Sequence, residues 1–394
     1  MLWLSSSYPR FETDSASVFL RYLAQSLSTK DLQIHVMAPD DSQVDAKFDQ
    51  GLVTIHRFRY FFPVCLQRLA YGSGILPNLR ASPWLVGLVP FFVLSQFVFG
   101  LILIKRIKPA LIHAHWLIPQ GVIAVLLGKL TGVPVVVTAH GGDAFALKGG
   151  ILDKLKSWTV KNSCYWTSNT PATAIAVGPS LPRPVVIPMG VDCALFAAGK
   201  PLVHDFTGHI LLFVGRLVEK KGVSHLLTAF SLLPDAMRAN SCLWIVGDGT
   251  ERAALEALAE QLQIRRHVVF HGRIPNKALP AYYAAADVFV APSVIDSLGD
   301  TEGQGVILLE AMASGVAVIA SRTGGIAEII SDGNNGLLIE PANPEILKQA
   351  IEQLLVDNHL RQRLGHAGRS FVQAYDWSCV AAQFTELYQR IAKS

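Results

Sequence analysis

The sequence contains little cysteine and little charge. Its 394 residues include five Cys, none of which stands in a CxxC pair, and only 16% of the residues are charged. Cysteines so few and so scattered exclude a disulfide-based scaffold and a cysteine zinc site, and they favour a reducing compartment. Because 51% of the residues are hydrophobic, the chain is too apolar to be disordered. Its length favours two folded domains.

Two nucleotide-binding signatures are also absent. No GxGxxG follows the first apolar run, where three serines stand instead, and no GxxxxGK[ST] occurs anywhere. A dinucleotide site and a P-loop therefore have no support. The first residues lack a basic segment ahead of an apolar one, so we expect no signal peptide. The net charge of +4 is too small to predict nucleic acid as a partner.

The charge is unevenly divided along the chain. Residues 1–190 hold 17 Lys and Arg against 9 Asp and Glu, a balance of +8. The remainder holds 17 against 21, a balance of −4, and the two sum to +4. A basic first half favours an anionic partner, and chance variation of the surface charge is the alternative.

Apolar strands, turns and helices alternate along the chain. Short Val, Ile and Leu runs, such as 111–115 and 135–139, are typical of a parallel sheet covered on both faces. Residues 179–209 are rich in Pro and Gly and predict a linker, after which the pattern restarts. We therefore predict an α/β fold of two doubly wound, Rossmann-like domains, 1–193 and 200–376, which face each other across a cleft. A last helix at about 378–394 is expected to pack back on the first domain.

A basic, glycine-flanked turn follows the expected strand 209–214. The turn reads GRLVEKKG from Gly215 to Gly222 and precedes a helix, so it lies at the carboxyl end of a strand, where ligands bind in this architecture. Arg216 can hold a phosphate with two parallel N–H bonds, and Lys221 adds a point charge. A solvated basic turn is the alternative.

Two glutamates, Glu302 and Glu310, flank the expected start of a helix after strand 288–291. Gly303 and Gly305 precede that helix, whose first amides can bind an anion. The two carboxylates are up to about 12 Å apart along the helix. This spacing is wide for a glycoside hydrolase, whose carboxyls lie about 5 to 9.5 Å apart, but it suits the two ends of a long ligand. A capping acid and a surface glutamate are the alternative.

His140 and Asp143 follow the expected strand 135–139 in the segment HGGD. They therefore lie at the carboxyl end of a strand of the first domain, and the two glycines leave room for a ligand beside the histidine. His113 and His115 alternate on the preceding strand and point to one face. A packed, hydrogen-bonded pair is favoured there over a metal pair, because the spacing supplies no third ligand.

The order of these motifs closely resembles retaining nucleotide-sugar glycosyltransferases of family 4, which have the GT-B fold. The resemblance covers nearly the whole chain, through SSSYPRF, HAHWLIPQG, VVVTAHGGD, PMGVD, FVGRLVEKKG, WIVGDG, AADVFVAPS and EGQGVILLEAMASG. One departure is the turn Thr13–Ser17, where many members carry a glycine-rich loop. It leaves Ser15, together with Asp143, as an expected contact on the acceptor side.

The resemblance implies a role for each candidate residue. Arg216 and Lys221 would bind the donor diphosphate, Glu310 the ribose, and Glu302 the donor sugar. The backbone at Arg273 and Ile274 would hold the base, and the loop Gly303, Gln304, Gly305 and Val306 would complete the donor site. His140 would lie near the reacting anomeric carbon, so the expected catalytic residues are His140, Glu302, Arg216 and Lys221.

The expected activity is retaining transfer of a sugar from a nucleotide-diphosphate donor to an acceptor hydroxyl, in polysaccharide or glycolipid assembly. A UDP-sugar is favoured because such donors are frequent in the family. No cofactor and no metal are expected, and the acceptor would be a glycan or a lipid-linked glycan. A nucleotide-sugar epimerase and a non-catalytic sugar-nucleotide-binding module are the alternatives.

One stretch, residues 84–104, is nearly all apolar and as long as a membrane span. Strand-like segments stand on both sides of it, and membership of one sheet would prevent a crossing. Cations surround it, and no Asp or Glu occurs between Asp49 and Asp143. We expect a helix that is buried or rests on an anionic membrane. The expected location is cytoplasmic, either free or peripheral at the inner face of the membrane.

Overall fold

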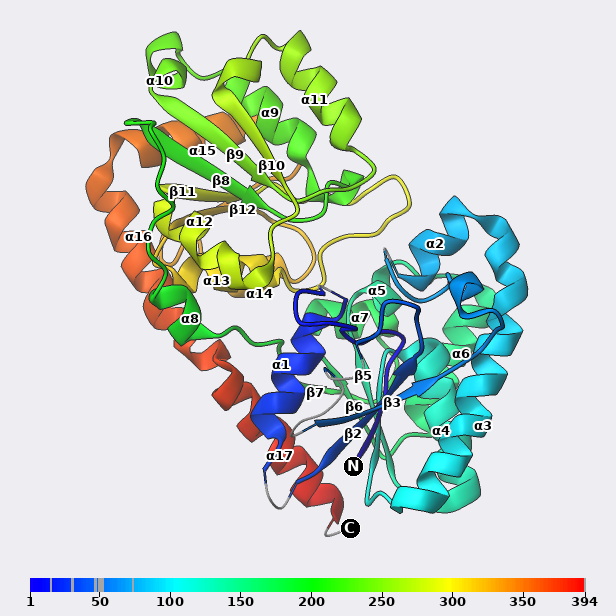
Figure 1. Cartoon of the computed structure of the whole chain (residues 1–394). Coiled ribbons are helices and arrows are strands. Elements are labelled where there is room, and N and C mark those ends of the chain that lie inside the picture. The colour runs from blue at the N-terminus through cyan, green and yellow to red at the C-terminus, as the bar shows by residue number, and fades with distance from the viewer. Residues whose placement is uncertain (15, 30–31, 46–47, 49–52, 73, 393–394) are drawn as a thin grey trace. The chain divides into compact units, whose positions relative to one another are not determined.

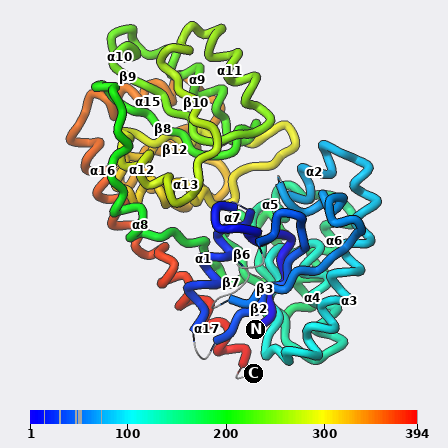
Figure 2. Tube along the Cα trace, in the orientation of Figure 1, coloured from blue at the N-terminus to red at the C-terminus, as the bar shows by residue number. Residues whose placement is uncertain are grey.

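The structure, a computed structural model, describes residues 1–14, 16–29, 32–45, 48, 53–72 and 74–392. The chain divides into two α/β units (Figures 1 and 2). The first unit comprises Met1–Pro188 and Trp377–Ser394, and the second comprises Met189–Asp376. Two Rossmann-like units with parallel sheets confirm the predicted fold class.

The sheet of the first unit has the order β3-β2-β1-β4-β5-β6-β7, with all neighbours parallel. Its order reverses between β1 and β4, which is where ligands bind in doubly wound sheets. The strands are β1 (Leu2–Leu4), β2 (Ile34–Pro39), β3 (Val53–Phe58), β4 (Ile112–His115), β5 (Val135–Ala139), β6 (Tyr165–Ser168) and β7 (Val185–Val186).

Helices cover both faces of this sheet. Figure 1 shows α1 and α17 on one side and α3, α4 and α6 on the other. The bounds are α1 (Val18–Leu27), α2 (Ile75–Ala81), α3 (Val89–Ile107), α4 (Val122–Thr131), α5 (Gly142–Phe145), α6 (Gly150–Lys161), α7 (Pro171–Val177) and α17 (Trp377–Ala392), with the short turns η1 (Val64–Leu66), η2 (Pro83–Leu88) and η3 (Leu117–Gly121).

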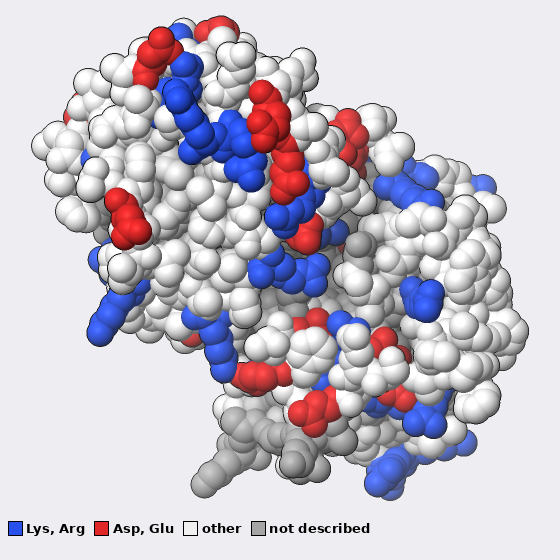
Figure 3. Space-filling view, turned by 45° about the horizontal axis from the view of Figure 1, so that its top comes forward, with Lys and Arg blue, Asp and Glu red and all other residues white. Residues whose placement is uncertain are grey.

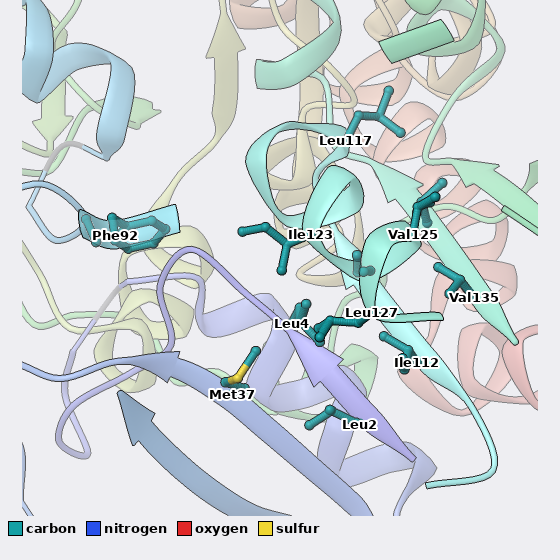
Figure 4. Packing of buried hydrophobic residues seen from close by; sticks show 14 of the residues in the cluster. Leu2, Leu4, Met37, Phe92, Ile112, Leu117, Ile123, Val125, Leu127 and Val135 are labelled. Carbon is teal, nitrogen blue, oxygen red and sulfur yellow. The ribbon is translucent and has the colours of Figure 1, made fainter. Parts of the chain in front are cut away.

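The core of the first unit lies between the sheet and α3 and α4. Figure 4 shows Leu4 and Met37 of the sheet near Ile123 and Leu127 of α4, and all four side chains are buried. Gly100 lets α3 approach α4, because a Cβ there would lie only 2.8 Å from Cδ1 of Leu127. The apolar runs of the sequence therefore form the interior of a covered parallel sheet.

The second unit repeats this plan. Its parallel sheet has the order β10-β9-β8-β11-β12-β13, which reverses between β8 and β11. The strands are β8 (His209–Val214), β9 (Ser241–Val246), β10 (Val268–Gly272), β11 (Val288–Ala291), β12 (Ala317–Ser321) and β13 (Leu337–Ile339). Two buried apolar clusters pack against this sheet, one including Leu226 and Leu354, the other including Leu308.

Helices cover both faces of the second sheet as well. They are α8 (Cys193–Ala197), α9 (Val223–Ser231), α10 (Asp235–Ala239), α11 (Arg252–Gln261), α12 (Leu279–Ala285), α13 (Val306–Ala313), α14 (Ile326–Ile329), α15 (Pro344–Val356) and α16 (Asn358–Phe371), with the short turns η4 (Glu219–Lys221), η5 (Arg265–His267), η6 (Asn276–Ala278) and η7 (Val372–Tyr375). The buried Leu226 belongs to α9, Leu308 to α13 and Leu354 to α15.

The segment between the two sheets differs from the predicted linker. Residues 179–209 contain β7 and α8, and β7 pairs with β6 at the edge of the first sheet. Proline is tolerated beside such an edge strand, so the Pro-rich composition does not exclude it.

The boundary between the units also differs from the predicted one. Residues 189–193, which we assigned to the first domain, belong to the second unit. The reason is their hydrogen bonding, because Met189 N–H donates to Oε1 of Gln304 at 2.7 Å and Val191 N–H donates to the Tyr375 carbonyl at 3.0 Å. The helix α17 belongs to the first unit, where it packs on α1.

Candidate active site

The carboxyl ends of β8 and β11 meet at the point where the second sheet reverses its order. The turn 215–222 follows β8, and the segment 292–305 follows β11. The topology therefore brings together two motifs that are distant along the chain, and a hydrogen bond joins Lys221 to Glu302, 81 positions away. This is the place where doubly wound sheets bind ligands.

An ion pair between Lys221 and Glu302 connects the two motifs. Lys221 is only 8% exposed, and its Nζ donates to Oε2 of Glu302. The preceding Lys220 donates to Oδ2 of Asp300 at 2.8 Å and to the Thr301 carbonyl at 3.1 Å. Burial raises the pKa of Glu302, but Lys221, Lys220 and Arg216 more than offset this effect and hold the pKa below its usual value. Glu302 is therefore ionised at neutral pH.

The turn that carries Lys221 is fixed by a close backbone approach. Gly222 has a φ of 65°, and a Cβ at this position would overlap the carbonyl oxygen of Pro292. Only glycine suits both the left-handed conformation and the lack of space. The loops after β8 and β11 therefore pack backbone to backbone, which fixes the position of Lys221.

Glu310 is buried on α13 and has a different environment. Its Oε2 accepts a hydrogen bond of 2.8 Å from the hydroxyl of Tyr283 on α12. Burial raises the pKa of Glu310 to about 7, although Tyr283 and Lys221 act in the opposite direction. The two glutamates of the motif thus differ in charge near neutral pH, since Glu302 is ionised and Glu310 is at its midpoint.

The side chain of Gln304, a residue expected at the donor site, is hydrogen-bonded within the second unit. Its side chain is 3% exposed, its Oε1 accepts from Met189 N–H at 2.7 Å, and its Nε2 donates to the Met189 carbonyl at 2.9 Å. Both polar groups of the side chain are therefore used to hold the segment that enters the second unit. What Gln304 can offer a ligand is its backbone.

The remaining predicted donor residues lie on loops of the second unit. Arg216 and Arg273 are exposed, and Ile274 is half-buried after β10. Gly303 and Gly305 precede α13, whose first residue is Val306, and Gly305 is the N-cap of that helix with a φ of 78°. Leu308 N–H donates to the Gly305 carbonyl at 2.8 Å. The amides of Val306 and Ile307, the first two residues of the helix, have no carbonyl one turn earlier in the helix and can bind an anion.

The carboxyl ends of β4 and β5 in the first unit carry histidines. Nδ1 of His115 lies 3.1 Å from Nε2 of His140, and His113 contacts the hydroxyls of Tyr388 at 2.8 Å and Thr138 at 2.7 Å. Burial lowers the pKa of His113 and His140 to about 3 and that of His115 well below its usual value. All three are neutral at pH 7, as packed and hydrogen-bonded histidines rather than a charged cluster.

The second ring nitrogen of His140, Nδ1, does not take part in the contact with His115. This nitrogen is buried and has no hydrogen-bond partner among the described residues. A neutral imidazole has one N–H donor and one acceptor nitrogen. If Nε2 of His140 donates to His115, Nδ1 of His140 is an acceptor, and if Nε2 accepts, Nδ1 is a donor.

Asp143, expected on the acceptor side, is buried and hydrogen-bonded to backbone groups of its own unit. It is 1% exposed, and its two oxygens accept from Leu117 N–H at 2.7 Å and His140 N–H at 2.9 Å. Burial raises the pKa of Asp143 despite these bonds. The carboxylate therefore positions the backbone of His140. Ser15 lies outside the described residues.

Two contacts of the site could not be read from the sequence. Tyr283 stands in an ordinary apolar helix, and the Tyr388 that contacts His113 lies 275 positions away along the chain. Neither residue carries a local motif, so only the fold identifies them. Among the described residues, no group of three or more His, Cys, Asp or Glu could hold a metal ion.

The comparisons with known proteins agree with this geometry. The family described as glycosyl transferases group 1 matches residues 200–371, and glycosyltransferase family 4 matches residues 16–195. A glycogen synthase of Mycobacterium tuberculosis is 31% identical over 299 residues, which cover 71% of this chain and 69% of the relative. The chain belongs to the group 1, family 4 glycosyltransferases.

Other similar proteins support the same conclusion for the glycosyltransferase. A GDP-mannose-dependent α-(1-6)-phosphatidylinositol monomannoside mannosyltransferase of Mycolicibacterium smegmatis is 34% identical over 212 residues, 51% of this chain and 55% of that protein. A sucrose-phosphate synthase from Thermosynechococcus elongatus has a TM-score of 0.82 at 22% identity, covering 100% of this chain and 99% of the other. The last likeness shows that the glycosyltransferase has the GT-B fold.

Proposed function

We propose that this glycosyltransferase moves a sugar from a nucleoside diphosphate donor to an acceptor hydroxyl and retains the anomeric configuration. The observation that carries the proposal is the buried Lys221–Glu302 pair beside the exposed Arg216, at the switch point of the second sheet. Fixed cations at this place suit a diphosphate, and the first amides of α13 add further donors.

The bond that breaks joins the anomeric carbon to a phosphate oxygen of the donor. The bond that forms joins the same carbon to the acceptor oxygen, on the same face of the sugar. The nucleoside diphosphate leaves with the bonding electrons and takes the acceptor proton. Arg216 and Lys221 would stabilise the negative charge that develops on the leaving group, so we propose transfer without a metal ion.

The two glutamates and His140 would position the donor. Ionised Glu302 would accept hydrogen bonds from sugar hydroxyls, and Glu310 would accept them from the ribose. His140, neutral because it is buried, would offer Nδ1 near the anomeric carbon without adding charge.

For the donor and the acceptor, the relatives suggest a choice to be tested. A UDP-sugar is the donor that the family resemblance favours, and the mannosyltransferase relative makes GDP-mannose the competing one. That relative's name also describes a glycolipid acceptor, which supports a role in glycolipid or polysaccharide assembly. The five free cysteines support a cytoplasmic location.

Incubation of the purified chain with UDP-, GDP- and ADP-sugars tests the proposal, with and without EDTA. We expect a glycosylated acceptor whose anomeric configuration, determined by NMR, matches that of the donor. An inverted product would contradict retention, and loss of activity in EDTA would contradict metal-free transfer. Conversion of the donor to its epimer without an acceptor would favour an epimerase, and nucleotide binding without any product would favour a binding module.

A further inference from the structure

The helix α3 carries apolar side chains on two opposite faces. Phe92, Leu103 and Ile104 point into the core. The opposite stripe, here named the outer face of α3, comprises Phe91, Leu94, Val98 and Ile102, which are 51%, 61%, 45% and 60% exposed. These positions are separated by three or four residues and therefore form one continuous stripe. A helix of a soluble protein normally has polar residues there.

The segments that neighbour α3 also carry exposed apolar side chains. The ring centroids of Phe61 and Phe91 are 5.6 Å apart, and the residue after Phe61, Phe62, is 83% exposed. Trp84 precedes α3 and is 59% exposed. The helix α4, which packs on α3, has two exposed apolar side chains of its own, Leu126 and Leu130. Exposed apolar patches of this kind mark interaction sites.

Cations stand at one end of the same surface. Lys105, Arg106 and Lys108 are exposed at the carboxyl end of α3, and no ion pair involves them within the described residues. Lys129 in the last turn of α4 donates to the neutral Asn162 at 2.7 Å. In Figure 3, the side of the first unit on which α2 and α3 lie in Figure 1 is mostly uncharged, with separate Lys and Arg groups.

The topology prevents this helix from crossing a membrane. The segment Pro83–Ile107 is long and apolar enough to span a bilayer, and only 33% of its most apolar window is buried. However, β3 before it and β4 after it belong to one hydrogen-bonded sheet. Both ends of α3 must therefore stay on the same side of the bilayer.

We propose that the outer face of α3 lies flat on an anionic lipid bilayer. Its apolar stripe would enter the boundary between headgroups and acyl chains, and Lys105, Arg106, Lys108 and Lys129 would contact anionic headgroups. Charge complementarity selects this occupant, because the sequence from 50 to 142 contains no carboxylate that would be repelled. The proposal concerns a surface of the first unit and does not depend on the donor or the stereochemistry.

Flotation of the full chain with vesicles tests the proposal. We expect binding to phosphatidylcholine vesicles that contain about 30% phosphatidylglycerol, and weak binding to phosphatidylcholine alone. The variant Leu94→Ser/Val98→Ser/Ile102→Ser should lose binding. Lys105→Ala/Arg106→Ala/Lys108→Ala should weaken it by about a hundredfold at low salt, because each cation contributes about a fivefold factor.

A matched control is Val203→Ser/Val356→Ser, which removes two exposed apolar side chains, 94% and 75% exposed, from the second unit. It should bind vesicles like the parent. Transfer to a soluble acceptor should be unchanged in all three variants, which separates this proposal from the proposed function. No binding to anionic vesicles at low salt, binding that resists alkaline wash, or a dimer that only the serine variant of α3 dissociates would each overturn the proposal.

Discussion

The two units share one topology but differ in the chemistry at the carboxyl ends of their strands. In the first unit these ends carry His115 and His140, which burial keeps neutral. In the second unit they carry Lys221 and Glu302, which remain charged because they pair. The two units therefore differ in the loops that follow their strands and not in the order of their sheets, and function depends on such loops. We infer that the second unit handles the charge of the donor and that the first supplies neutral hydrogen bonding.

The largest effect should come from removing a cation of the second unit. Arg216→Ala and Lys221→Ala should each lower turnover about a hundredfold or more, because in the proposed function each loses a group that would stabilise the leaving diphosphate. Steady-state kinetics measures the loss, and circular dichroism checks the fold. Arg322→Ala, which removes an exposed arginine near Glu340 in the same unit, is the control. Turnover within threefold of the parent in Arg216→Ala would contradict the inference that the second unit handles the charge of the donor.

A second test separates the two glutamates. Glu310→Ala should weaken free nucleotide and complete donor alike, by about thirtyfold, because both contain the ribose. Glu302→Ala should affect turnover or sugar selection more than nucleotide binding. Calorimetry with the nucleotide and with the full donor measures both effects. Equal losses for both variants on both ligands would contradict these separate roles.

The contact between His115 and His140 offers a smaller test within the first unit. His115→Ala should lower turnover about tenfold without weakening nucleotide binding, because it removes the group that fixes the hydrogen on His140. His115→Asn keeps an amide near the position of Nδ1 and should recover much of the activity. A loss of nucleotide affinity in His115→Ala would show that the first unit also contributes to binding of the charged nucleotide.

The smallest effect should be a pH dependence that belongs to the second unit alone. Glu310 has a pKa of about 7. In the proposed function, ribose hydroxyls would donate to the ionised form of Glu310, so binding would lower this pKa and affinity would rise with pH. We expect nucleotide affinity to increase about fourfold from about pH 6.5 to about pH 8. Glu310→Gln should abolish the change, whereas an equally steep change in this variant would show that another group titrates.

Local signals predicted the fold and the position of the donor motifs. Apolar runs identified the strands, and the turns after β8 and β11 lie where the motifs indicated. The roles of Gln304 and Asp143 were not predictable, because both depend on backbone groups of Met189 and Leu117 that are distant in sequence. The spacing of residues along the sequence shows which residues follow a strand. It does not show which distant backbone N–H group will donate a hydrogen bond to a given side chain.

The return of α17 to the first unit has a consequence for truncation and for domain exchange. The second unit is an insertion in the first, with both junctions near the bridge between Val191 and Asp376. A stop codon at position 377 would leave the second unit complete and deprive the first of Phe384 and Tyr388, which are buried against it. Loss of α17 would therefore damage the first unit, although α17 follows the whole second unit along the chain. Recombination could exchange the second unit intact only through two breakpoints.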